Sequence, residues 1–301
     1  MAEFIQYLIT GLTLGMIYSL IALGFSLIYR VTNVINFAQG EFVMLGGMLM
    51  IQFVYFFKLN YFLSLVLVLS IIAIFSYFFE ELTLKPFKKS PALIKIIFTI
   101  GASIFVRGLA MIIFWKDPGL RYENFFPEKY FNIFGAIITA QDIFIITATV
   151  VLFIVFFILM EVTITGKAMK ACAINMKAAR IIGINVPLML KLSFILSGLL
   201  GAFAGIIITP KLGMSYNTGV FWGIKGFTAA VLGGLDSGGA VLFGGVVLGL
   251  LESLLTGYGG QLSFGLFKSE YKDIIICIVL ILLIILKPNG IFIKKGNFER
   301  V

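Results

Sequence analysis

The sequence has no histidine and only two cysteines, and each shortage excludes a class of chemistry. Without histidine the chain cannot form a His-ligated metal site, a Ser-His-Asp triad or an imidazole proton relay. Cys172 and Cys277 lie far apart in the chain, so they form no CxxC pair and predict no disulfide framework. We therefore assign no catalytic residue and no metal ligand.

Charge is also scarce. Charged residues make up 12% of the 301 positions and hydrophobic residues 60%, whereas a soluble domain is about a quarter charged and about half apolar. Folding alone cannot keep so many apolar side chains from water, so the expected solvent is a lipid bilayer. The net charge of +9 comes from short basic runs between apolar stretches. Such runs are typical of membrane-flanking loops, and no nucleic-acid partner is expected.

Apolar residues are abundant, and they form eight long runs. A helix of about 20 residues crosses a bilayer, and backbone groups in lipid must bond internally, so we expect helices. A ninth stretch, Phe221–Leu235, is short and is expected either to cross or to enter as a half-helix. We predict an all-α integral membrane protein, a polytopic bundle of eight or nine transmembrane helices in one domain, 1–301. The eight runs are Phe4–Ile28, Ile35–Phe57, Tyr61–Leu84, Ile96–Trp115, Ile143–Met160, Leu192–Thr209, Ala240–Leu255 and Ile274–Leu286.

Lysine and arginine predict the orientation of these runs, because they concentrate in cytoplasmic loops. With nine crossings and a cytoplasmic C-terminus, 14 basic residues fall in inside loops and 7 in outside loops. We therefore expect the N-terminus outside and the C-terminus in the cytoplasm.

The largest inside loop, 161–191, is rich in Ala, Met and Lys, which favour helices. Gly183 offers a helix stop, and one or two short amphipathic helices are expected on the cytoplasmic surface. They either rest at the lipid headgroups or dock a cytoplasmic partner. For docking, the small residues Ala178, Ala179 and Gly183 would permit close approach, and Arg180 would pair with an acidic groove.

Two polar breaks interrupt the apolar pattern. The first runs from Asn33 to Glu41 and contains Asn36 and Gln39; Asn33 or Asn36 is expected to cap the next helix. A helix N-terminus within the membrane suits a substrate carboxylate. The alternative is that Asn36 and Glu41 only cap and pair where a helix meets the cytosol.

The second break lies between paired glycines, at Asp236-Ser237, and either residue is expected to cap the following helix. Broken helices at corresponding positions of two halves mark the pathway of many transporters. We therefore place Asn36, Gln39, Glu41 and Ser237 along a substrate pathway. The GxxxG pairs, such as Gly11/Gly15 and Gly245/Gly249, are interpreted as helix-packing contacts.

Arg107 lies within a predicted span, where a charge facing lipid is costly, so it should face the bundle or a partner. Glu252 and Asp142 are its candidate counter-ions. The chain contains no GxxxxGK[ST] motif. If transport is driven by ATP, another chain must hydrolyse it.

Three stretches together resemble the integral-membrane permeases of bacterial branched-chain amino acid ABC importers. They are Leu20–Gly47, with the motif Asn36-Phe-Ala-Gln-Gly-Glu41; the loop Gly166–Asn185, with Ala178-Ala-Arg180; and Leu232–Gly249. Similar permeases often have histidine at the position of Gln39.

The resemblance implies a multi-subunit importer in the bacterial cytoplasmic (inner) membrane. It would contain this permease, a second similar permease, two cytoplasmic ATPases that bind ATP and magnesium, and an extracytoplasmic substrate-binding protein. The loop Gly166–Asn185 would be the coupling helix seated in an ATPase groove, with Gly166, Ala178, Ala179, Arg180 and Gly183 as its coupling residues. Alternatives are a permease for urea, short amides or another amino acid, and a gradient-driven carrier that needs no ATPase.

Overall fold

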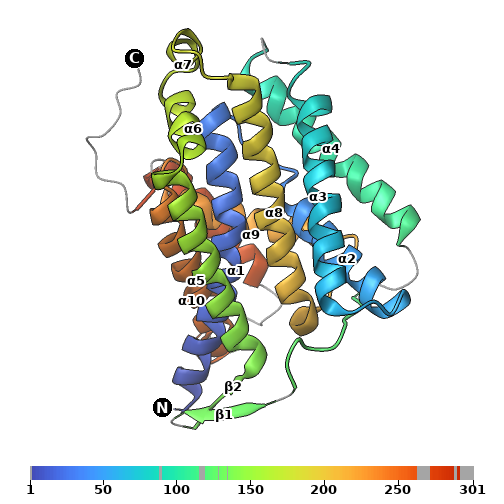
Figure 1. The fold of residues 1–301 in the computed structure, drawn as a ribbon. Coiled ribbons are helices and arrows are strands. Elements are labelled where there is room, and N and C mark those ends of the chain that lie inside the picture. Colours follow the sequence, from blue (N-terminus) through green and yellow to red (C-terminus); the bar gives the residue numbers. More distant parts are fainter. Residues whose placement is uncertain are drawn as a thin grey trace.

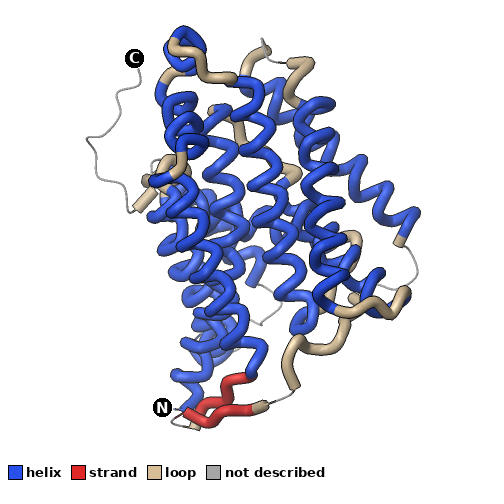
Figure 2. Tube along the Cα trace, in the orientation of Figure 1, coloured by secondary structure: helices blue, strands red, loops and turns tan. Residues whose placement is uncertain are grey.

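In a computed structural model, the chain forms a helical bundle with one small hairpin (Figures 1 and 2). The structure describes residues 2–87, 90–114, 119–127, 129–133, 135–262, 272–287 and 290–291. The predicted span end at Trp115 lies outside the described residues, as do seven of the basic residues counted for the orientation: Lys88, Lys89, Lys116, Lys268, Lys294, Lys295 and Arg300. The helices are α1 (Ala2–Thr32), α2 (Gln39–Ile51), α3 (Tyr61–Thr83), α4 (Ala92–Ile113), α5 (Ala140–Val162), α6 (Ile164–Ile174), α7 (Met176–Ile181), α8 (Val186–Leu212), α9 (Thr218–Gly233), α10 (Gly238–Leu262) and α11 (Lys272–Leu286).

The predicted all-α, polytopic membrane fold is confirmed. In the part of the chain that the structure describes, seven helices are long and apolar enough to cross a bilayer: α1, α2 with the π-helical turn Gln52–Phe56 that continues it, α3, α4, α5, α8 and α10. Helices α9 and α11 have 16 and 15 residues. At 1.5 Å per residue they rise about 24 and 22 Å, less than the roughly 30 Å hydrocarbon core. The stretch predicted as a ninth span or half-helix is the short helix α9.

Helix α1 runs through the bundle and packs along α10. Glycines make this contact close: a Cβ on Gly11 would lie 2.9 Å from the Leu250 Cα, and one on Gly15 2.7 Å from the Val246 Cα. Gly249 faces Gly15 from the other helix. Without side chains in between, the two backbones gain van der Waals contact along their length. The predicted packing role of these GxxxG glycines is confirmed.

Helices α3, α4 and α5 form the apolar exterior. Only 28%, 22% and 22% of their spanning windows are buried, and the outward side chains are large and apolar, such as Phe62, Ile112 and Phe157. Exposure of so large an apolar surface to water would be unfavourable. These faces therefore fit a lipid environment.

A two-stranded hairpin, β1 (Tyr130–Ile133) and β2 (Ala136–Thr139), precedes α5. The Gln6 amide holds it to α1 by two hydrogen bonds with the backbone of Ile137, at 2.7 and 3.1 Å. The hairpin lies at the end of the bundle that holds the N-terminus, and α6 and α7 lie at the opposite end (Figure 2). The hairpin was not predicted from the sequence.

Candidate functional site

The first polar break is a turn between α1 and α2. Asn33, at the end of α1, has φ of 55°, and the Asn36 side chain accepts a hydrogen bond from the Ala38 N–H at 3.1 Å. Helix α2 itself begins after Ala38 without a side-chain cap. The prediction that Asn33 or Asn36 caps this helix is therefore wrong: Asn36 closes the turn that precedes it, as asparagine often does.

Gln39 begins α2 and is fully buried. Its amide nitrogen donates to the Ser197 carbonyl at 3.0 Å, and its amide oxygen accepts from the Ser197 hydroxyl at 2.7 Å. The same hydroxyl also reaches the carbonyl of Gly24. Gln39 therefore joins α2 to α8 and α1, and in this conformation its polar atoms are engaged within the protein.

Glu41, two residues further on, is 2% exposed and pairs with α4. Its Oε1 accepts hydrogen bonds from the Ser103 hydroxyl at 2.8 Å and from Arg107 Nη2 at 3.0 Å. Arg107 therefore faces the bundle, as predicted. Its partner is not one of the expected counter-ions: Glu252 pairs with Lys225, and Asp142 pairs with Lys211.

Ser237 lies in the second break, between α9 and α10. Its hydroxyl accepts from the Ala240 N–H at 3.3 Å, so the predicted cap is confirmed. The left-handed Gly234, with φ of 98°, ends α9, and Ser26 of α1 donates to the Leu235 carbonyl at 2.7 Å. This turn packs on α1, whereas Gln39 bonds to Ser197 of α8 and Glu41 bonds to α4, so the predicted pathway residues contact different helices.

The predicted surface helices are present as α6 and α7, at one end of the bundle (Figure 1). Thr163 caps α6 and Asn175 caps α7, and Gly183, with φ of 89°, provides the predicted stop. Asn185 and Pro187 then start α8. These residues make a helical hairpin whose shape the local sequence largely determines.

The five predicted coupling residues divide by exposure. Ala178, Arg180 and Gly183 are exposed. Gly166 is buried against Leu159 and Met160 of α5, and Ala179 is 2% exposed. Gly166 and Ala179 therefore hold α6 and α7 to the bundle and do not themselves present a surface to a partner.

Four exposed isoleucines lie on α6, on α7 and directly after α7, and they were not predicted from the sequence. Ile164 and Ile181 are each 86% exposed, and Ile182 and Ile174 are 73% and 64% exposed. The buried residues of α6 are Gly166, Met169 and Cys172, and the isoleucines lie outside that face; nothing in the sequence alone separates them from core isoleucines. We call these four residues the isoleucine surface. Cys172, on the inner side, is buried, and burial raises the pKa of its thiol.

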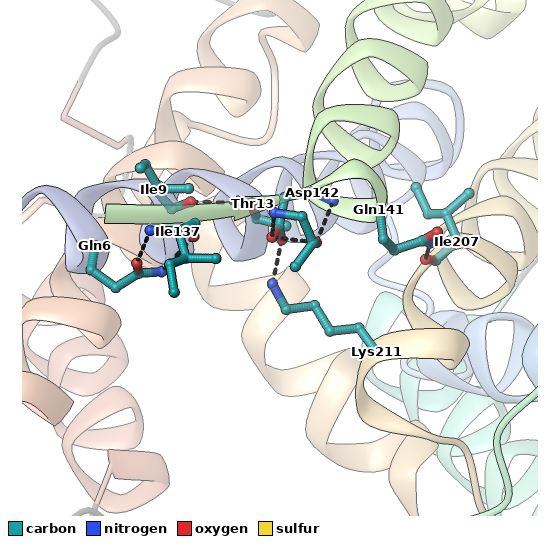
Figure 3. Close-up of polar contacts among 9 residues, drawn as sticks. Gln6, Ile9, Thr13, Ile137, Gln141, Asp142, Ile207 and Lys211 are labelled. Atoms are coloured by element: carbon teal, nitrogen blue, oxygen red, sulfur yellow. Dashed lines mark hydrogen bonds and ion pairs between the residues drawn. The ribbon is translucent and has the colours of Figure 1, made fainter. Parts of the chain in front are cut away.

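At the hairpin end of the bundle, opposite α6 and α7, polar contacts join the helices (Figure 3). Lys211 of α8 forms an ion pair with Asp142 of α5, and the Asp142 and Thr139 side chains form a capping box at the start of α5. Gln141 donates to the Ile207 carbonyl at 2.8 Å. Together with the Gln6 contact to β2, these bonds tie α1, α5 and α8 at the hairpin end.

Comparison with known proteins identifies the family. Residues 7–284 match the model of the family described as "Branched-chain amino acid transport system / permease component". The chain belongs to this permease family.

Two relatives match this permease along almost its whole length. It is 32% identical to the high-affinity branched-chain amino acid transport system permease protein BraD of Pseudomonas aeruginosa, with 99% of this chain and 98% of the relative covered. It is 30% identical to LivH, of the same description, from Escherichia coli K12, with the same coverage. A solved structure titled "PsaBC from Streptococcus pneumoniae in complex with Fab" matches with a TM-score of 0.52 and 13% identity over 96% of each chain, and supports the fold alone.

Proposed function

We propose that this permease is the membrane subunit of an ATP-driven importer of branched-chain amino acids. The named substrates of BraD and LivH support the choice of leucine, isoleucine and valine. The chain lacks a phosphate-binding loop, so ATP and magnesium would bind to two partner ATPases. A second permease and an extracytoplasmic binding protein would complete the assembly in the bacterial cytoplasmic membrane.

The isoleucine surface carries the proposal. Exposed isoleucines on helices too short to span a bilayer are costly in water and favour a protein partner. Ala178 and Gly183, both exposed and small, would allow that partner to approach closely, and Arg180 adds a charge at its rim. ATPase closure would then act on α5 and α8, which flank α6 and α7 in the chain.

A pull-down in mild detergent tests the docking. The wild-type chain should co-purify with an ATPase and a second hydrophobic subunit. Ile181→Ser should reduce the ATPase recovered by about tenfold or more, because it removes one of the two most exposed apolar side chains of the isoleucine surface. The matched control is Ile112→Ser on α4, an isoleucine that is 73% exposed on the apolar exterior. Unchanged recovery with Ile181→Ser would mean that these helices rest on lipid headgroups.

The orientation has a separate test. With α6 and α7 in the cytoplasm and the N-terminus outside, Ala178→Cys should react with an impermeant maleimide only after the cells are opened. The parent chain measures the background from its own two thiols: Cys172 is buried and its raised pKa slows its reaction, and Cys277 is partly buried. Labelling of Ala178→Cys in intact cells would reverse the proposed orientation.

A further inference from the structure

The inner face of α4 is polar although the rest of the helix is apolar. Thr99, Ser103 and Arg107 recur at every fourth position and therefore share one face. Thr99 accepts a hydrogen bond from the Phe37 N–H at 3.3 Å, and the other two side chains reach Glu41. The start of α2 thus lies against a polar stripe on α4.

Three polar side chains at this contact each have one buried atom without a hydrogen-bond partner. In the described part of the chain, the Glu41 Oε2, Arg107 Nε and Asn36 Nδ2 atoms are buried and have no hydrogen-bond partner. Buried polar atoms in proteins are nearly always bonded, so each exception calls for an explanation. The unused set contains one anionic acceptor and two donors, one of them on a cation.

This set complements the head group of an α-amino acid. An ammonium group needs an acceptor such as Glu41 Oε2, and a carboxylate needs donors such as Arg107 Nε and Asn36 Nδ2. Asn36 lies in the turn before α2 and Glu41 in the first turn of that helix; the Asn36 carbonyl accepts from the Gln39 N–H and the Ala38 carbonyl from the Glu41 N–H. Arg107 has 27% of its side chain exposed, although its Nε atom is buried.

Glycine backbone of α9 covers the Glu41 carboxylate. A Cβ on Gly219, in the first turn of α9, would lie 2.5 Å from Glu41 Oε2, and one on Gly40 would lie 2.8 Å from the Gly223 Cα. Only glycines allow α9 to cover the carboxylate this closely. A substrate ammonium would reach Oε2 once α9 separates from α2 at these glycines.

We propose that Glu41, Arg107 and Asn36 form a binding station for the head group of an α-amino acid inside the permease. The proposal rests on the proposed function and adds to it the substrate chemistry that the pathway recognises. Glu41 binds the ammonium group, and Arg107 and Asn36 bind the carboxylate. The half-buried ring of Phe37, four residues before Glu41, provides apolar surface for a branched side chain.

Saturation-transfer NMR on the full chain in detergent tests this station, because the method detects millimolar binding. The probes are L-leucine, 4-methylpentanoate, which lacks the ammonium group, and 3-methylbutylamine, which lacks the carboxylate. Wild type should prefer leucine over either analogue by about tenfold, the effect of one charge-assisted hydrogen bond. Glu41→Gln should abolish the preference for leucine over 4-methylpentanoate, whereas Asp142→Asn, at another ion pair, should retain it.

Equal binding of the three probes to wild type, no leucine signal, or an unchanged preference in Glu41→Gln would each overturn the station. If Glu41→Gln fails to fold, the wild-type probe series decides alone. ATP-dependent leucine uptake by the assembled importer, measured in parallel, separates the two proposals. Uptake without head-group discrimination rejects only the station, whereas no ATP-dependent uptake rejects the proposed function.

Discussion

Two of the charged clusters in the described part of the chain, at Glu252 and at Glu41, use their carboxylates differently. In the first, Glu252 accepts from Lys225 at 2.7 Å through one oxygen and from the Tyr18 hydroxyl at 2.5 Å through the other. In the second, Glu41 uses Oε1 twice and leaves Oε2 without a partner.

Their exposure differs as well. Lys225 has 12% of its side chain exposed and also forms an ion pair with Asp273 at 3.0 Å, so this cluster joins α1, α9, α10 and α11. Arg107, at 27%, stands on a helix with few buried residues. The Glu252 carboxylate, with both oxygens hydrogen-bonded between packed helices, serves the fold, and the Glu41 carboxylate, with one oxygen left over beside a loosely packed helix, is suited to a ligand.

The largest expected effect is the loss of the Lys225 charge. Lys225→Met leaves Glu252 buried without its cation, which should lower the free energy of unfolding by about 3–5 kcal/mol. Thermal unfolding in detergent would measure it. A loss below about 1 kcal/mol would mean that the cluster at Glu252 does not stabilise the packing of its helices.

A smaller effect is expected where a neutral donor is removed from each cluster. Tyr18→Phe removes the bond to Glu252 Oε2 and should cost about 1.5–3 kcal/mol, because that oxygen loses its neutral donor. Ser103→Ala should cost about 0.5–1.5 kcal/mol, since Arg107 still donates to the same Glu41 oxygen. The same unfolding assay measures both variants. A larger loss of unfolding free energy for Ser103→Ala than for Tyr18→Phe would contradict the distinction between the two clusters.

The smallest effect should come from the pair at the hairpin end. Lys211 has 28% of its side chain exposed, and Asp142 keeps its bonds to Thr139 without it. Lys211→Met should therefore cost about 1 kcal/mol or less, as for other partly exposed pairs. A cost near that of Lys225→Met would place this pair with the structural cluster.

Local features were predictable from the sequence, and distant pairings were not. The spans, the stop at Gly183 and the cap at Ser237 follow from hydropathy and from residue preferences that act within a few positions. The bond between Glu41 and Arg107 joins residues 66 positions apart, and it depends on how α2 and α4 lie together. The four-residue strands of the hairpin carry too little periodicity to stand out from a loop.

The sequence also did not predict which residues of a short helix are exposed. Ala178 and Ala179 are adjacent and alike in the sequence, yet one is exposed and the other buried. The difference arises from the way α7 packs on its neighbours α6 and α8, which the local sequence does not determine. The isoleucine surface was missed for the same reason, because isoleucine is equally common in cores.

Leucine uptake into proteoliposomes tests the central claim, that a separate motor drives this permease, most directly. Vesicles that contain the co-purified assembly and a loaded binding protein should accumulate leucine with ATP at the ATPase side and should stop when ATP is replaced by a non-hydrolysable analogue. The purified chain alone should accumulate none. Uptake by the chain alone, driven by an ion gradient, would contradict the account.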